Sequence, residues 1–462
     1  MNTSTVTGSE NIIIQDVNNS TITLNINGQV KEVQNQLSEL KELLKNLKVQ
    51  NIQYAEKIYN IDQINEANFG VVTSPKVFNG VLTKELILRL KDKKRVESFL
   101  SSLPPEDKDG WDSVRQHLKK AQGILEDSFV WVIGWELRRL FSIGNDKNKV
   151  LEIKIAEYIN HCFSTYRITL ELANYIFISK LWDEKANNNK INSDLPPIRD
   201  FFNSNRSLKL TELRILFQTL LEIFQKEKLE YPLDPSDIDG FDQFILPDSK
   251  FNTACAEIEK LDAIDDTSEV YGLGHCHTAE ISLTTILSQF KFFTNYQLVT
   301  LKKIEYEESR NSPARYIKDL NVLEKHEAAE LKRLLKYDNM PAKTYSVFFR
   351  NKNRSVNLFP FLLDYNALTN EEDFQILFHQ CLEGESGLSY YSIKTEKEEI
   401  IHYMANTAER IEIKSEEQKE EMQRNLRLDL VPKQFEEAMN TILGTSFSFK
   451  PKGNTKDKME NI

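Results

Sequence analysis

Two histidines near the middle of the chain come nearest, in type and spacing, to a catalytic or metal-binding group. The segment Tyr271–His277 reads YGLGHCH, so His275 and His277 are two residues apart. On an extended segment both imidazoles would point to one side, which would suit a zinc ion or a general base. Chain-distant residues that could complete such a site are His379, Cys381 and His402. Because none of them lies at a recognised ligand spacing, we interpret the turn as structural.

An acidic loop between residues 231 and 244 is a second group of possible ligands. Its carboxylates are Asp234, Asp237, Asp239 and Asp242. Calcium prefers such oxygen ligands, but the glycine and the final bidentate glutamate of an EF-hand loop are not in register here. We therefore expect neither a metal ion nor a cofactor.

The motifs of several common enzyme classes are absent from the sequence. There is no GxxxxGK[ST] loop, no GxSxG elbow and no kinase HRD or DFG motif. The segment HEAAE differs from the HExxH motif of metalloproteases because residue 330 is Glu. The sequence favours a protein without catalytic activity, and a metal-dependent hydrolase that uses His275 and His277 is the alternative.

The charge balance of the chain is acidic. It has 59 Lys and Arg residues against 70 Asp and Glu residues, a formal net charge of −11. Nucleic-acid binding needs concentrated Lys and Arg, so this balance does not favour it. The residues that keep nucleic-acid binding as an alternative are Lys343, Arg350, Lys352 and Arg354. Another basic run, Lys91–Arg95, is interpreted as a solvated helix end, because cations are favourable near the C-terminal end of the helix dipole.

Targeting signals and cysteine usage indicate the compartment. The N-terminus lacks a basic region followed by an apolar one, and no apolar run is long enough to span a membrane. The four cysteines are far apart and form no CxxC pair, as is typical of reduced, buried thiols. We expect a cytoplasmic protein.

The stretch Ser128–Trp182 is the longest apolar segment and predicts the helical core. Its apolar residues recur at steps of three and four from Ile155 to Leu181, which is the period of a helix buried on several sides. From Tyr296 onward the period changes to alternation, which predicts strands, with one helix expected over HEAAELKRLLKYD.

The N-terminus predicts a β-hairpin over Asn11–Asn27, with Asn18 and Asn19 in the turn. This turn pairs Val17 with Ser20, Gln15 with Ile22 and Ile13 with Leu24. One face then carries Ile13, Val17, Ile22, Leu24 and Ile26, and the other carries Ile12 and Ile14. An isolated hairpin is marginally stable in water, so it needs a partner surface on its own domain or on another chain.

A heptad pattern follows the hairpin directly. Its a and d positions are Val30, Val33, Leu37, Leu40, Leu44 and Leu47. Such a helix packs on its own domain or joins chains as a short coiled coil. Because the seam follows a hairpin that exposes both faces, we predict association. The predicted interface residues are Ile22, Leu24, Ile26, Val30, Val33, Leu37, Leu40, Leu44 and Leu47.

These patterns predict an α+β fold with four parts. Residues 1–50 would form the hairpin and coiled-coil segment, and residues 51–295 a large all-α domain. A β-rich recognition module would span residues 296–405, and residues 406–462 would form a C-terminal helix and a disordered tail. We expect the β-rich module to be separable from the helical domain.

Three segments taken together resemble the N-terminal and helical regions of bacterial conflict-system proteins, mainly of the Bacteroidota type. They are NIIIQDVNNSTITLNING with its heptad helix, AEKIYNIDQINEANF, and FVWVIGWELRRLFSIG followed by YINHCFSTYRITLELANYIFISKLW. The strands around VNLFPFLLDY, FQILFHQCL and YYSI resemble a β module found downstream of effector domains in such proteins.

This resemblance implies a function in defence against phage or invading DNA. Regions of this kind act as effector-associated or adaptor domains beside ATPase, kinase or other effector modules. The resemblance therefore implies a non-enzymatic adaptor, sensor or scaffold. Its partners would be further copies of itself and an effector or ATPase encoded nearby.

Overall fold

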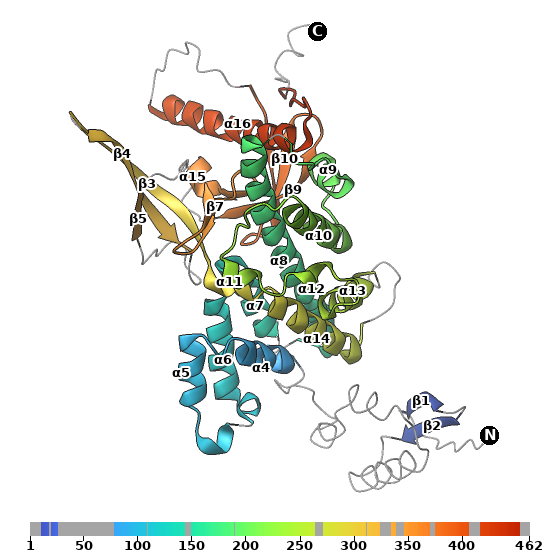
Figure 1. Ribbon diagram of the computed structural model, residues 1–462. Helices are drawn as coiled ribbons and strands as arrows, with labels where there is room; N and C mark the ends of the chain where they lie inside the picture. Colours follow the sequence, from blue (N-terminus) through green and yellow to red (C-terminus); the bar gives the residue numbers. More distant parts are fainter. Residues whose placement is uncertain are drawn as a thin grey trace. The chain divides into compact units, whose positions relative to one another are not determined.

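The computed structural model describes residues 11–17, 20–25, 78–108, 110–143, 149–188, 190–263, 271–310, 312–323, 334–338, 346–369, 375–405 and 416–452 (Figure 1). The chain divides into two compact units, Met1–Val72 and Thr73–Ile462. Helices and antiparallel sheets together confirm the predicted α+β class. None of the helices in the described ranges has the length and apolarity needed to cross a membrane.

The first unit contains a β-hairpin, β1 (Asn11–Val17) and β2 (Ser20–Asn25). Val17 is opposite Ser20 as predicted, but the predicted pairs beyond it are wrong. Ile14 is opposite Ile22 and Ile12 is opposite Leu24, because an irregularity between Ile14 and Val17 shifts the register by one residue. The predicted interface positions Ile26, Val30, Val33, Leu37, Leu40, Leu44 and Leu47 lie outside the described residues.

The second unit begins with helices. They are α4 (Gly80–Arg89), α5 (Lys94–Ser101), α6 (Arg115–Ser128), α7 (Trp131–Ile143), α8 (Leu151–Asn187), α9 (Pro196–Asn203), α10 (Leu210–Lys226), α11 (Pro235–Ile238), α12 (Asp242–Ile245), α13 (Lys250–Asp262) and α14 (Leu273–Gln289). Short 3-10 turns lie at Pro105–Asp107, Trp111–Ser113 and Lys291–Asn295.

Helix α8 is the central element of this unit, as the apolar stretch predicted. It is 37 residues long and contacts α7, α10, α14 and α16 as well as β7 (Figure 1). Tyr158, Tyr166, Tyr175 and Phe177 along it are almost completely buried. Their burial on several sides explains why apolar residues occur around most of the helix instead of on one stripe.

Two antiparallel sheets follow. The first has the order β5-β4-β3-β6-β7 and consists of β3 (Gln297–Ser309), β4 (Ser312–Val322), β5 (Leu334–Asp338), β6 (Val347–Arg350) and β7 (Ser355–Asn357). The second has the order β11-β10-β9-β8 and consists of β8 (Leu362–Asp364), β9 (Ile376–Glu383), β10 (Gly387–Ser392) and β11 (Lys397–His402). A bridge between Ser346 and Leu363 connects them. Helices α15 (Tyr365–Thr369) and α16 (Glu416–Leu443) complete the unit.

One prediction in this region is wrong. The segment HEAAELKRLLKYD was expected to be helical, but its last five residues form β5, which pairs with β4. Leu335 lies opposite Leu320 in that ladder. Pairing with a neighbouring strand thus overrides the helical propensity of the Leu and Lys residues. This pairing is a tertiary contact, so the local sequence does not predict it.

The helices and the second sheet share one hydrophobic core. Tyr175 of α8 packs against Phe361 and against Phe378 of β9, with ring centroids 6.0 and 5.9 Å apart. Phe435 of α16 reaches the same cluster, 6.1 Å from Phe361. This core includes residues on both sides of the predicted limits at residues 295 and 405.

Candidate functional site

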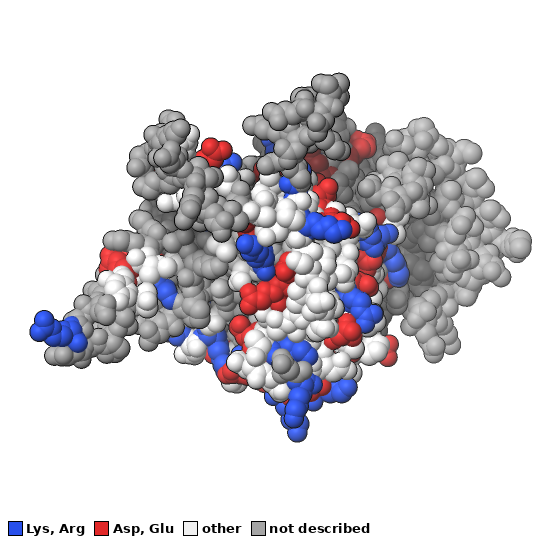
Figure 2. All heavy atoms as spheres, turned by 90° about the horizontal axis from the view of Figure 1, so that it is seen from above, with Lys and Arg blue, Asp and Glu red and all other residues white. Residues whose placement is uncertain are grey.

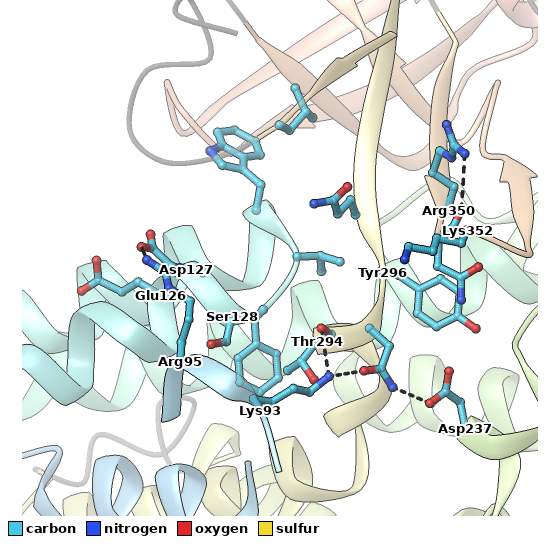
Figure 3. A pocket seen from close by; sticks show the side chains of 18 of the residues that line it. Lys93, Arg95, Glu126, Asp127, Ser128, Asp237, Thr294, Tyr296, Arg350 and Lys352 are labelled. Atoms are coloured by element: carbon cyan, nitrogen blue, oxygen red, sulfur yellow. Dashed lines mark hydrogen bonds and ion pairs between the residues drawn. The ribbon is translucent and has the colours of Figure 1, made fainter. Parts of the chain in front are cut away.

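A cleft of about 950 Å³ lies between the helices and the first sheet of the second unit. Its walls come from the start of α5, the junction of α6 and α7, the segment before α11 and the turn between β6 and β7 (Figure 3). A volume of this size is typical of small-molecule sites, which commonly occur where two parts of a fold meet. We therefore treat this cleft as the candidate site.

The first wall is built around Lys93, which immediately precedes α5. Its ammonium donates to the carbonyl oxygen of Thr294 at 3.3 Å and to the amide oxygen of Asn295. Asn295 in turn donates to Asp237 at 2.5 Å (Figure 3). Burial lowers the pKa of Lys93, with Asp92 and Asp237 acting in the opposite direction.

The second wall is the tight junction between α6 and α7. Arg138 donates to Glu126 at 3.1 Å, and Arg95 donates to Asp127 at 3.0 Å. Burial raises the pKa of Glu126, and the neighbouring Arg138 partly offsets that effect. A Cβ at Gly134 would lie 2.2 Å from the carbonyl oxygen of Glu126, so only glycine permits this close approach.

The third wall is the β6–β7 turn, which is fixed to the loop before α11. Asn351 donates to a carboxylate oxygen of Asp234 at 2.6 Å, and the Asp234 backbone N–H donates to the hydroxyl of Tyr296 at 2.6 Å. Arg354 forms an ion pair with Glu230. These contacts hold the turn in place while Lys352 stays exposed at the cleft.

The basic run Lys91–Arg95 lies between two helices. It follows the C-terminal end of α4 at Arg89, as predicted, but it also enters α5, which begins at Lys94, and Lys93, Lys94 and Arg95 line the cleft. The sequence contains a signal for this placement, because the helical spacing of Val96 and Phe99, both buried, begins only after the run. The run therefore precedes an amphipathic helix.

The predicted histidine turn is part of a helix. Leu273 begins α14, so His275 and His277 are two residues apart on a helix and point in different directions. His275 Nδ1 accepts a hydrogen bond from the Gly272 backbone N–H at 3.0 Å, which satisfies a donor at the helix N-terminus. His277 is exposed. This geometry supports the structural interpretation.

The other candidate ligands are dispersed. His379 and Cys381 lie on β9 and His402 on β11. Within the described ranges, no group of three or more His, Cys, Asp or Glu residues could hold a metal ion. In the acidic loop, Asp242 accepts from Gln225 at 3.3 Å, and the contacts of Asp234 and Asp237 are those of the cleft walls.

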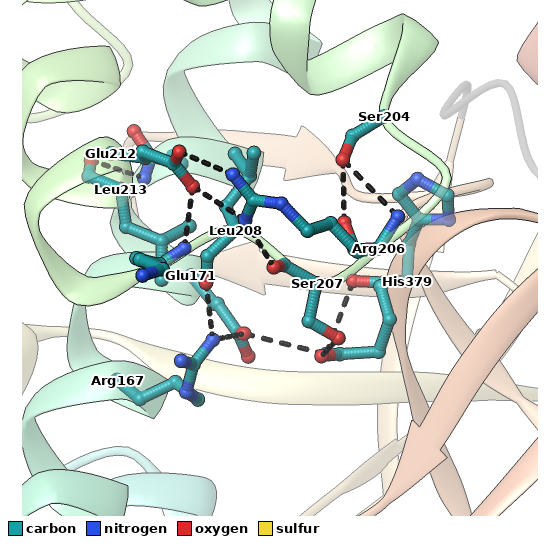
Figure 4. A network of polar contacts seen from close by, with 12 residues as sticks. Arg167, Glu171, Ser204, Arg206, Ser207, Leu208, Glu212, Leu213 and His379 are labelled. Carbon is teal, nitrogen blue, oxygen red and sulfur yellow. Dashed lines mark hydrogen bonds and ion pairs between the residues drawn. The ribbon is translucent and has the colours of Figure 1, made fainter. Parts of the chain in front are cut away.

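A second polar network joins α8 to β9 (Figure 4). Arg167 donates to the Leu208 carbonyl oxygen at 2.8 Å and lies 3.5 Å from the buried Glu171. Gln380 donates to Glu171 at 3.3 Å and accepts from Ser207 at 2.9 Å. Burial raises the pKa of Glu171, and the nearby Arg167 lowers it. Because its members contact one another and the backbone, we assign this network to structure.

Comparison with protein-family models, with curated proteins and with solved structures finds no match to this chain.

Proposed function

We propose that this chain is a non-enzymatic adaptor or scaffold of a bacterial multi-protein defence system, acting in the cytoplasm through protein–protein association. Its partners are further copies of itself, through the N-terminal hairpin and heptad segment, and an effector or ATPase. The resemblance to conflict-system proteins supports the defence setting. The observation that supports association with a partner protein is the long hairpin of β3 and β4.

The β3–β4 hairpin extends beyond the strands that flank it (Figure 1). Strand β6 pairs with β3 only over Gln297–Thr300, and β5 pairs with β4 only over Ile317–Asn321. Among the described strands, residues 306–309 of β3 and 312–316 of β4 therefore pair only with each other, and we call this part the β3–β4 arm. Strand edges without neighbours can accept a strand from another chain.

The arm also presents an aromatic pair. Tyr306 and Tyr316 are direct cross-strand partners, with ring centroids 5.3 Å apart. Their exposed fractions are 54% and 48%, whereas most other tyrosines of the second unit are buried or half-buried. Tyrosine is enriched at the centres of protein interfaces because it offers a large apolar area and a polar end. The arm therefore has the composition and geometry of a contact surface.

The experiment removes the arm without disturbing the rest of the fold. Ile304 and Lys318 are paired, so an Asn-Gly turn joining them in place of residues 305–317 preserves the ladder. We expect tagged full-length protein to capture the same partner from its native host reproducibly, and the shortened chain to lose it. Tyr306→Ser with Tyr316→Ser should weaken capture of that partner. Mass spectrometry identifies the partner, so that the same protein is compared between the variants.

A matched control substitutes exposed apolar residues elsewhere. Ile215 and Leu246 are 45% and 50% exposed on α10 and after α12, so Ile215→Ser with Leu246→Ser changes a similar kind of surface. This variant should retain the partner. Capture of every partner by the chain without the arm would overturn the proposed role of the arm.

A further inference from the structure

More basic than acidic side chains line the cleft of Figure 3: Lys93, Lys94, Arg95, Arg138, Arg350 and Lys352 against Glu126, Asp127, Asp234 and Asp237. Each of its four carboxylates already accepts a hydrogen bond from a side chain of the cleft: Glu126 from Arg138, Asp127 from Arg95, Asp234 from Asn351 and Asp237 from Asn295. The carboxylates of the cleft are thus already hydrogen-bonded to side chains of the cleft itself. An excess of basic side chains in one cleft is unexpected in a chain of net charge −11.

Three lysines of the cleft contact no carboxylate. Lys94 and Lys352 are exposed and make no hydrogen bond or ion pair with any described residue. Lys93 donates only to neutral oxygen atoms, those of Thr294 and Asn295. In Figure 3, Lys93 and Lys352 approach the cleft from different walls, so their charges converge on the space between them. On the face of the molecule shown in Figure 2, by contrast, positive and negative side chains alternate.

An aromatic surface borders the same cleft. Trp135 is half-buried, and its ring centroid lies 5.8 Å from that of Trp131. The guanidinium of Arg138 lies over the Trp135 ring at 5.8 Å from its centroid. Trp135 also lines the cleft, so a planar ring can stack on the part of its ring that stays exposed.

We propose that this cleft binds a nucleotide, with its phosphates near Lys93, Lys94 and Lys352 and its base against Trp135. Lysines that contact no carboxylate bind phosphate oxygens through charge-assisted hydrogen bonds. The volume of about 950 Å³ accommodates a small molecule and not a duplex. The inference is independent of the adaptor function, because it concerns neither the N-terminal segment nor the β3–β4 arm.

The test titrates full-length protein with ATP or with inorganic pyrophosphate by calorimetry at low ionic strength. Both probes carry phosphates, but only ATP carries a base. We expect ATP to bind more tightly than pyrophosphate, and Lys94→Gln with Lys352→Gln to weaken ATP binding by roughly tenfold or more. Trp135→Leu should reduce the affinity for ATP towards that for pyrophosphate. Thermal melting of each variant checks that the fold is intact.

The matched control is Lys119→Gln with Lys226→Gln. Both lysines are exposed on α6 and α10, away from the cleft, so this variant loses the same charge and should bind ATP as the unaltered chain does. Equal weakening in the control would mean non-specific attraction and would overturn the proposal. Absence of heat with either probe at millimolar concentration would also overturn it. Equal affinity for ATP and pyrophosphate would contradict the proposed contact between the base and Trp135.

Discussion

His379 lies in an apolar environment that is unusual for a histidine. Its ring packs among Phe201, Tyr390 and Phe435, with centroids 5.6, 5.5 and 4.7 Å away. Both ring nitrogens are buried and have no hydrogen-bond partner in the described part of the chain. Burial lowers the pKa of His379 to about 3, so the folded protein holds a neutral imidazole.

This environment predicts acid sensitivity. In the unfolded chain His379 takes up a proton near its ordinary pKa of about 6.5, and in the folded chain it does so only near 3. Stability is therefore fully present above pH 6.5 and falls as the pH decreases towards 3. His379→Leu, of similar volume, removes this dependence. Melting temperatures at pH 7.5 and pH 5 should differ less for the variant than for the unaltered chain.

The control for this prediction is His277→Leu on the exposed face of α14. That substitution should leave the difference between the two pH values unchanged. If His379→Leu and His277→Leu melt with the same pH dependence, burial of His379 does not govern acid stability.

At the scale of elements, the hairpin and heptad segment predict the oligomeric state. Leu37 and Leu44 occupy a positions of the seam, and glutamate there places charges in a packed apolar interface. Leu37→Glu with Leu44→Glu should reduce the mass measured by light scattering and leave the helical circular dichroism of the second unit nearly unchanged. Ser38→Glu with Asn46→Glu, at b and c positions, should retain the mass. A monomeric unaltered chain, alone and with its partners, would contradict the prediction.

The elements also show what the sequence could and could not predict. Long periodicity predicted α8, because burial on several sides produces a regular apolar pattern over many residues. The C-terminal helix was also expected, and it is α16. In the hairpin, the pair Val17–Ser20 was predicted correctly and the other pairs were not, because a local irregularity adds a residue to one strand. The strand β5 was missed because pairing with β4 is not a local property.

The cleft could not be predicted from the sequence for a similar reason. Lys94 and Lys352 belong to two basic groups that the sequence shows, but these groups are far apart in the chain. Their place in one cleft depends on Asp234, which anchors the β6–β7 turn through Asn351, and on Lys93, which contacts Thr294. Such contacts depend on tertiary packing. Of the two histidines that sequence spacing singled out, His275 accepts a hydrogen bond at the helix N-terminus and His277 is exposed.

At the scale of the whole molecule, the shared core makes the sheets part of the helical body. Deleting residues 296–403 would leave Tyr175 without Phe361 and Phe378, and Phe435 without Phe361. Truncating one buried aromatic side chain costs about 3–5 kcal/mol, which is a large fraction of the stability of a typical domain. We expect the deleted chain to lose cooperative thermal unfolding, as measured by circular dichroism. Retention of a sharp transition near that of the intact chain would show that residues 296–405 are separable after all.

The second unit also contains hydrogen bonds between residues that are far apart in the chain. The Ser193 hydroxyl donates to the backbone carbonyl of Ile442, and Leu82 donates to Glu280 at 2.9 Å, across separations of 249 and 198 residues. Contacts so distant in sequence form slowly, and those of α8 with α16 cannot form until the last helix has left the ribosome. While the chain is being synthesised, the apolar surface of α8 around Tyr175 therefore stays uncovered. We expect its yield in cells to depend on chaperones that bind nascent chains.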